Sequence, residues 1–306
     1  MNPILAIIIA NIIWGAASPI FKFALTNIPP FTLAFCRFFF AALFFLPFIK
    51  KYWKKISLKD YFELFLIAFF GITVNITFFF LGLQKTTSIN APIISSAGPV
   101  FIYILSVLFL HEQKNMKVFN GMMIALIGVF AIIFSPVFLD GKGINFGEIQ
   151  GNVFLFIAMI GSVLNVVIGK RVMREVNPYQ VTFLSFVFGA IPFIPFMLRE
   201  LQHWSFSQLD VRGWTGIIFG VIFSSAIAYF FHYYAMSKIK AQEIGLFTYI
   251  DPVIAVFIAV PLLKEYPNLF FFIGSLLVFG GIYLAEGRIH WHPFHKLKNH
   301  TILRSI

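Results

Sequence analysis

An acidic side chain stands beside a proline in the middle of an apolar stretch, at Asp251 and Pro252 in YIDPVIAVF. Proline has no N–H, so Pro252 leaves the carbonyl oxygen of Thr248 without its usual helical donor. An acid inside a membrane-spanning helix costs about 2.5–3.5 kcal/mol and normally faces the protein interior or a wet cavity. We therefore expect Asp251 to bind a substrate amine or a proton. The alternatives are a purely structural hydrogen-bonding group and a group exposed in a wide vestibule.

Two more residues raise related questions. Arg37 lies inside another apolar run. It either extends towards the membrane surface and tethers its helix, or it binds an anion such as a substrate carboxylate or helix-end carbonyl groups. Pro99 interrupts a further helix as Pro252 does. Such a break forms either a simple kink that helps helices pack or, when it recurs in corresponding helices, a binding site. We favour the binding site.

Polar side chains recur every three or four residues in several apolar segments, so each set shares one helix face. Ser225, for example, extends the stripe of Tyr229 and His232. The predicted substrate site comprises Trp14, Ser18, Arg37, Ser95, Pro99, Tyr103, Asn165, Tyr229, His232, Thr248 and Asp251. Asp251 and His232 are also the candidates for proton coupling. For each residue the alternative is an interhelical hydrogen bond worth about 0.6 kcal/mol.

The elements that must position these side chains are membrane-spanning helices. Hydrophobic residues make up 59 % of the 306-residue chain and charged residues only 11 %, against about 25 % charge in soluble domains. Stretches of roughly 17–25 apolar residues can cross a bilayer as helices. Ten are predicted, at residues 3–22, 32–49, 62–83, 89–110, 119–138, 151–169, 179–198, 214–235, 244–263 and 269–286.

The positive charges are divided unequally between the two sides of these helices. With the N-terminus inside, sixteen of the 23 Lys and Arg fall in the cytoplasmic connections and the tail, and six in the opposite connections. Basic residues are retained on the cytoplasmic side during insertion, so both termini should face the cytoplasm. We expect a multi-pass protein of the plasma (cell inner) membrane. Because topology accounts for the net charge of +11, nucleic acid is not an expected partner.

The chain repeats itself. A shift of 148 residues aligns Lys22 with Lys170, and a shift of 153 aligns Pro99 with Pro252 and Glu112 with Glu265. We predict a first five-helix repeat at 1–138, a linker at 139–150, a second repeat at 151–287 and a cytoplasmic basic tail at 288–306. Five is an odd number, so the second repeat should enter the membrane inverted, which suits alternating access.

The ends of the two repeats, residues 98–133 and 251–285, resemble the EamA unit of the drug/metabolite transporter superfamily. The shared pattern is a proline, an apolar run, a glutamate at the helix end and two glycines in the last helix. The helix residues Trp14, Gly15, Lys22 and Arg37 also resemble that unit. The glycine that usually precedes the glutamate is replaced, by Lys264 in the second repeat. The resemblance implies a ten-helix carrier with a central cavity that moves small metabolites, often outward.

The predicted function is secondary transport of a small organic metabolite, amino-acid-like or amphipathic, by alternating access and in the direction of export. A lipid flippase and a membrane pore are the alternatives. An enzyme acting on lipid head groups would need clustered acids, whereas the twelve Asp and Glu are scattered singly. We expect no enzymatic activity, cofactor or metal.

The expected partners are the small-molecule substrate and membrane lipids. The tail at 288–306 is basic and flanked by aromatic residues, which favours contact with anionic lipid. Glycines seven residues apart, Gly121 with Gly128 and Gly274 with Gly281, give two helices a small face for close packing. That face forms either an internal seam or the contact of a possible homodimer.

Overall fold

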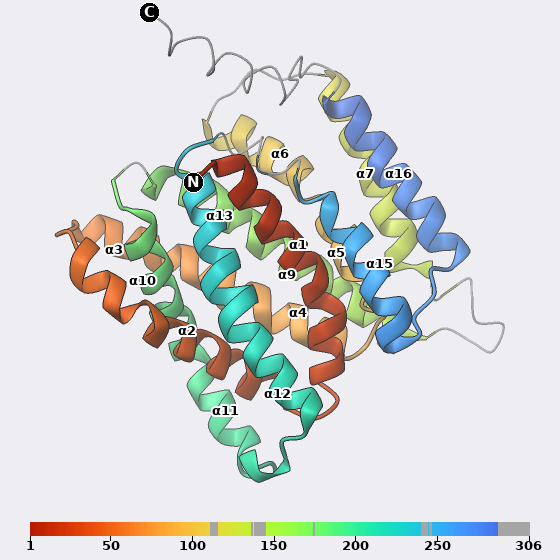
Figure 1. The fold of residues 1–306 in the computed structure, drawn as a ribbon. Helices are drawn as coiled ribbons and strands as arrows, with labels where there is room; N and C mark the ends of the chain where they lie inside the picture. The colour runs from red at the N-terminus through yellow and green to blue at the C-terminus, as the bar shows by residue number, and fades with distance from the viewer. Residues whose placement is uncertain are drawn as a thin grey trace, which may run out of the picture.

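The computed structural model describes residues 1–110, 116–135, 137, 145–173, 175–239, 244 and 247–286. Within them every regular element is a helix, and the helices gather into one bundle (Figure 1). In chain order they are α1 (Pro3–Ala24), α2 (Pro30–Tyr52), α3 (Leu58–Ala68), η1 (Phe69–Val74), α4 (Asn75–Leu83), α5 (Asn90–Ser95), α6 (Gly98–Leu110), α7 (Met116–Ile133), α9 (Phe146–Val172), α10 (Pro178–Ala190), η2 (Ile191–Phe193), α11 (Ile194–Glu200), η3 (Phe206–Gln208), α12 (Val211–Ile218), η4 (Phe219–Ile227), α13 (Ala228–Met236), α15 (Ile250–Leu263) and α16 (Leu269–Glu286).

Six helical stretches of the described chain are long and apolar enough to cross a membrane, judged by length and composition. They are Pro3–Ala24, Pro30–Tyr52, Leu58–Leu83, Phe146–Val172, Pro178–Glu200 and Val211–Met236. Shorter apolar helices occupy the remaining predicted segments. The prediction of an all-helical membrane protein is therefore confirmed. Ten spans, their inversion and cytoplasmic termini stay predictions.

Side-chain caps and prolines set where several helices begin. The Ser57 hydroxyl accepts from the N–H of Asp60, and the Asp60 carboxylate accepts from the N–H of Ser57, which forms a capping box at the start of α3. Asn145 accepts from the N–H of Glu148 through its side chain, so α9 begins at Phe146 and not at the predicted residue 151. Part of the predicted linker is thus helical.

The predicted breaks at Pro99 and Pro252 both lie at helix starts. The span predicted at 89–110 consists of two helices, α5 and α6, and Pro99 is the second residue of α6. Pro252 is the third residue of α15, which begins at Ile250 and so later than predicted. One expectation was wrong here: the carbonyl oxygen of Thr248 is not left unpaired, because it accepts from the N–H of Asp251 at 3.1 Å.

Two of the long spans contain a π-helical segment in their middle. These segments are η1, between α3 and α4, and η4, between α12 and α13. A π-helix widens the turn from the i→i+4 to the i→i+5 hydrogen bond, and such segments occur frequently at functional sites. The side chains on either side of each segment therefore no longer share the face that ordinary helical spacing predicts.

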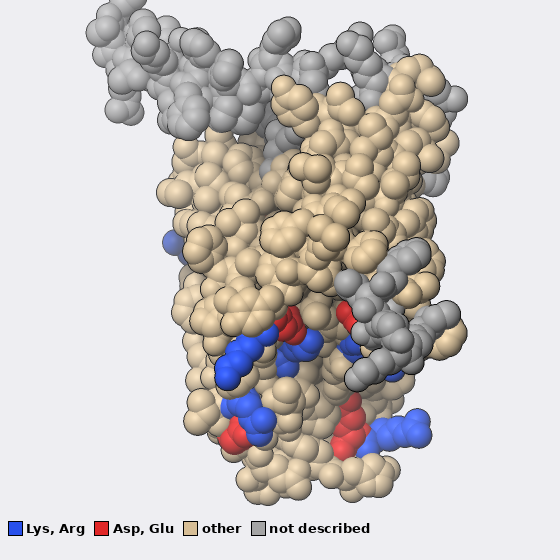
Figure 2. All heavy atoms as spheres, turned by 90° about the vertical axis from the view of Figure 1, so that its right-hand side faces the viewer, with Lys and Arg blue, Asp and Glu red and all other residues tan. Residues whose placement is uncertain are grey.

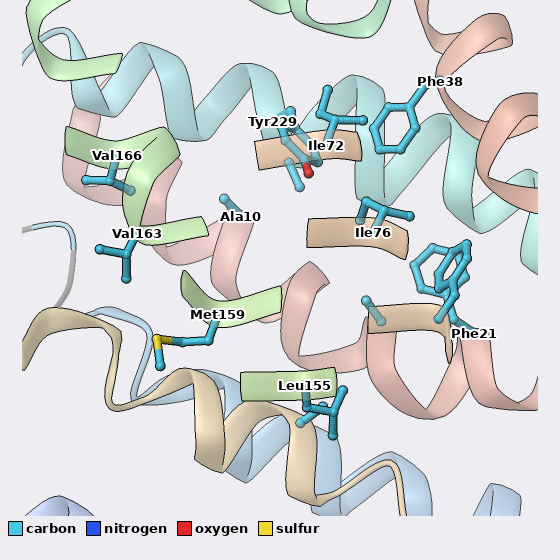
Figure 3. Packing of buried hydrophobic residues seen from close by; sticks show 14 of the residues in the cluster. Ala10, Phe21, Phe38, Ile72, Ile76, Leu155, Met159, Val163, Val166 and Tyr229 are labelled. Atoms are coloured by element: carbon cyan, nitrogen blue, oxygen red, sulfur yellow. The ribbon is translucent and has the colours of Figure 1, made fainter. Parts of the chain in front are cut away.

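The buried core lies along the middle of the bundle. Phe21 of α1, Ile76 of α4 and Met159 of α9 belong to one cluster of buried apolar side chains. Figure 3 shows these side chains directed towards the space between their helices. The core therefore draws on both the N-terminal and the C-terminal half of the chain.

The helices α7 and α16 pack along each other at one edge of the molecule (Figure 1). A Cβ atom added to Gly128 would lie 2.6 Å from the carbonyl oxygen of Gly274, and one added to Gly281 would lie 2.4 Å from that of Gly121. The glycine faces therefore meet inside one chain and form an internal seam. A homodimer stays a prediction that these glycines do not support.

We expect Gly128→Ala to lower the melting temperature of the purified protein by several degrees. The new methyl group would collide with a backbone carbonyl, and overpacking of this kind costs about 1–3 kcal/mol. Gly280→Ala is the matched control, because no heavy atom lies within 4 Å of its added Cβ. Equal melting temperatures for the two variants would contradict the close contact at Gly128.

The connection after α15 turns on a left-handed residue. Lys264 has φ 56° and ψ 33°, and it alone among the described non-glycine residues has a positive φ. The N–H of Lys264 donates to the carbonyl oxygen of Val260 at 3.1 Å, which is the single bond of an αL helix cap. Lys264 occupies the position where the resembled family usually has glycine, the residue that adopts this conformation without strain.

Candidate functional site

A cavity of about 170 Å³ lies among helices from both halves of the chain. It is bounded by α1, α2, the η1–α4 region, α5, α6, α9, the η4–α13 region and the start of α15. Ten of the eleven predicted site residues line it: Trp14, Ser18, Arg37, Ser95, Pro99, Asn165, Tyr229, His232, Thr248 and Asp251. Residues distant in the sequence are thus brought together in one place.

Tyr103, the eleventh predicted residue, does not line this cavity. The prediction treated Ser95, Pro99 and Tyr103 as one stripe of a continuous helix. The chain instead turns at Ser96 and Ala97, so α5 and α6 are separate helices and their side chains need not share one face. Tyr103 packs against the apolar core.

Asp251 enters the cavity from the first turn of α15. A Cβ atom added to Gly15 of α1 would lie 2.9 Å from both the Cα and the carbonyl oxygen of Asp251. Glycine at this point therefore lets α1 contact the backbone of α15 directly. The buried Oδ1 of Asp251 accepts no hydrogen bond from the described residues, and its carboxylate forms no ion pair with them.

Two more buried polar atoms on the cavity wall have no partner among the described residues. They are Oγ of Ser18 and Nδ1 of His232. Buried polar groups are nearly always hydrogen-bonded, to protein, water or ligand. Together with Asp251, an acid, a hydroxyl and an imidazole are therefore available to a molecule in this cavity.

Arg37 is buried, with 2 % of its surface exposed. Its Nε donates to Oγ of Ser225 at 2.7 Å, and its Nη2 donates to Oγ and to the carbonyl oxygen of Ser224 at 2.8 and 3.2 Å. The guanidinium also lies 4.8 Å from the ring centroids of Phe21 and Phe38. These contacts exclude the alternative of a side chain extended to the membrane surface. Arg37 instead joins α2 to the π-helical segment η4.

The two π-helical segments are bonded by side chains from the opposite half of the chain. The indole Nε1 of Trp14 donates to the carbonyl oxygen of Ser224 in η4 at 3.1 Å. The hydroxyl of Tyr229 donates to the carbonyl oxygen of Gly71 in η1, also at 3.1 Å. Trp14 and Tyr229 are themselves in edge contact, with ring centroids 5.2 Å apart. One aromatic pair thus connects both segments beside the cavity.

Sequence reasoning missed several residues of the site. Periodicity indicated Ser225, but its neighbour Ser224 lines the cavity, and the hydroxyls of both serines accept from Arg37. Asn75 was also missed. It donates to the carbonyl oxygen of Ala158 at 2.7 Å and lines the same wall. A lone asparagine inside an apolar span was the signal that could have identified it.

Comparison with known proteins identifies the family. The model of the EamA-like transporter family matches residues 1–134 and 149–286. The chain belongs to the EamA-like transporter family. The resemblance seen in the sequence is therefore confirmed, and this EamA-like protein is an integral membrane transporter.

The relatives cover nearly the whole EamA-like chain. An uncharacterized transporter, YetK, of Bacillus subtilis (strain 168) is 28 % identical over 289 residues, which are 93 % of this chain and 87 % of YetK. An uncharacterized transporter of Archaeoglobus fulgidus is 29 % identical over 272 residues, 89 % of this chain and 94 % of its own length. A solved crystal structure with 15 % identity superposes with a TM-score of 0.64, covers 92 % of this chain and 96 % of its own, and supports the fold alone.

This EamA-like transporter also has a charged cluster away from the cavity. Nζ of Lys22, at the end of α1, lies 2.6 Å from Oε1 of Glu265 and donates to the carbonyl oxygen of Thr86 at 2.6 Å. The carboxylate of Glu265 accepts from the N–H and hydroxyl of Ser88 at 2.7 and 2.6 Å. Figure 2 shows acidic and basic side chains lying next to one another in the lower part of one face. The cluster joins the end of α1 to two connections, the one between α4 and α5 and the one after α15.

Proposed function

We propose that this EamA-like protein is a secondary transporter that carries a small amphipathic organic solute through the central cavity by alternating access. The observation that supports the proposal is the cavity itself, enclosed by helices of both halves and lined by an acid, a cation and several aromatic side chains. A pocket with a few polar groups in an apolar wall is typical of small-molecule sites. The proposed location is the plasma membrane, and the proposed direction is export.

The charges in the cavity favour an amino-acid-like solute. Asp251 offers a carboxylate to an amine, and Arg37 places a positive charge on a different wall without an ion pair among the described residues. A zwitterion would complement both charges, and Trp14 and Tyr229 offer aromatic surface to its side chain. Buried charges are most stable when they are paired in this way.

Two equivalent contacts support inverted repeats. Lys22 at the end of α1 donates to the carbonyl oxygen of Thr86, and Lys170 near the end of α9 donates to that of Ile239. The sequence shifts of 148 and 153 relate these two pairs of residues to each other. The π-helical segments η1 and η4 also fall in corresponding spans. Exchange of the conformations of two such halves would open the cavity to one side and then to the other.

Counterflow in proteoliposomes tests the proposal. Vesicles that contain the protein are loaded with unlabelled amino acids, nucleobases or sugar phosphates, and uptake of the labelled compound is followed with and without a pH gradient. A carrier gives saturable uptake and transient accumulation above equilibrium. Flux that does not saturate would indicate a pore, and competition by lipids but not by soluble compounds would indicate a flippase.

A cross-link between positions 22 and 265 should stop counterflow. These residues lie on α1 and on the connection after α15, which must separate if the cavity opens at this end. The lone cysteine, Cys36, is first replaced by serine, and Lys22→Cys/Glu265→Cys is joined by a short reducible bis-thiol reagent. Reduction should restore exchange. A Ser205→Cys/Ser207→Cys pair within one connection is the control, and equal exchange before and after cross-linking at 22 and 265 would contradict the opening.

A further inference from the structure

A second cavity, of about 640 Å³, lies at the end of the bundle where the N-terminus is found. It is bounded by the start of α1, the connection after α2, the start of α10 and the end of α13. None of its lining residues also lines the central cavity. It is therefore a separate site, and the proposed transport mechanism makes no use of it.

The charged side chains on the wall of this second cavity are all basic. They are Lys51 and Lys54, at and just after the end of α2, and Lys238, just after α13. No Asp or Glu is among the described residues that line it. None of these three lysines forms an ion pair with a described residue. The cavity therefore concentrates positive charge that the described chain leaves uncompensated.

Aromatic stacking and hydrogen bonds fix the shape of the wall. The rings of Tyr52 and Tyr179 stack with centroids 4.3 Å apart and planes 7° apart. Asn177 donates through Nδ2 to the carbonyl oxygen of Tyr52 at 2.9 Å, and Gln180 donates through Nε2 to that of Lys54 at 2.7 Å. The end of α2, which carries Lys51, and the connection that carries Lys54 are thus held against the start of α10. Because the connection is already held in place, a ligand that binds here would not lose binding free energy in ordering it.

We propose that this basic cavity binds a phosphate group, carried by an anionic phospholipid of the membrane. Lysine is a common ligand of phosphate as a point charge. Basic pockets between membrane-spanning helices bind the head groups of anionic lipids. Tyr52 and Trp53, which line the cavity at the end of α2 and just after it, are 37 % and 44 % exposed. Aromatic residues are enriched where helices leave the bilayer, so the cavity lies at head-group level and a lipid is favoured over a soluble phosphate.

Thermal unfolding of the purified full-length protein tests the site. We expect phosphatidylglycerol to raise the melting temperature by several degrees, and phosphatidylcholine and inorganic phosphate to leave it unchanged. The variant Lys51→Gln/Lys54→Gln/Lys238→Gln should lose the increase. Lys50→Gln/Lys55→Gln/Lys59→Gln should keep it, because it removes the same charge from neighbouring positions that do not line the cavity.

Three results would overturn the proposal: an equal loss in both triple variants, an equal increase with phosphatidylcholine, or an equal increase with inorganic phosphate. The first would indicate unspecific attraction, and the last a soluble-anion site. If the first triple variant does not fold, Lys51→Arg/Lys54→Arg/Lys238→Arg and the three single glutamine variants replace it. The arginine variant should retain the increase and each glutamine variant should reduce it.

Discussion

Asp251→Asn is expected to reduce counterflow of the transported solute at least tenfold. Oδ1 of Asp251 is buried at the cavity wall and accepts no hydrogen bond from the described residues. A hydrogen bond between charged groups is worth about 1.5–3 kcal/mol, and 1.4 kcal/mol is a factor of about ten in affinity. The amide keeps the shape of the side chain but loses its charge. Wild-type activity should fall as the pH is lowered, because the carboxylate becomes protonated. The variant should lack this pH dependence.

The control for this experiment is Asp210→Asn, which removes an exposed acid from the connection before α12. Its transport rate and pH profile should match those of the wild type. Both variants should be compared at equal protein content in the vesicles and with equal melting temperature. If Asp251→Asn transports as fast as the wild type at every pH, the carboxylate binds neither the amine of the solute nor a proton. The alternative of a purely structural group would then hold.

Arg37→Lys should lower both the thermal stability and the transport rate. Lysine cannot reproduce the planar guanidinium that donates to Ser224 and Ser225 and lies against Phe21. Each lost hydrogen bond to a charged group costs about 1.5–3 kcal/mol. The serine hydroxyls would also remain buried without their donor. We expect the melting temperature to fall by several degrees and counterflow to fall several-fold.

Arg171→Lys is the matched control, since the Arg171 side chain is largely exposed. Its Nε lies 3.4 Å from Oε1 of Glu63 and forms an ion pair there. Such pairs contribute little to stability. Differential scanning fluorimetry and counterflow on both variants make the comparison. If Arg37→Lys has the same melting temperature and transport rate as Arg171→Lys, the hydrogen bonds from Arg37 to η4 contribute neither to stability nor to transport.

Much of the helical framework could be predicted from the sequence. Helices such as α1 and α16 were found within two residues of their ends, because a span needs an apolar run of fixed minimum length. Ten residues that line the cavity could also be predicted, because polar side chains stand out in an apolar span. Polar groups such as Asp251 and Asn165 cannot remain in hydrocarbon, so they must face the protein interior.

The remainder of the site depends on features that leave little trace in one sequence. Phe21 and Met159 line the cavity, but they look like any other apolar residue in a chain with 43 phenylalanines. Ser224, which accepts from Arg37, lies in a π-helical segment, where the 3.6-residue periodicity used for the prediction does not hold. The break between α5 and α6 had a similar effect on Tyr103. Contacts between distant residues, such as Lys22 with Glu265, require the folded chain.

The left-handed turn at Lys264 has a consequence for how this family can vary. The left-handed conformation of Lys264 ends α15 and turns the chain, and the carboxylate of the next residue, Glu265, lies against Lys22. A left-handed backbone costs an ordinary side chain about 1–2 kcal/mol that glycine avoids. A homologue with glycine at this position would make the same chain reversal without that cost. Positions 264 and 265 should therefore co-vary, with the strained residue tolerated only where the acid that follows it is retained.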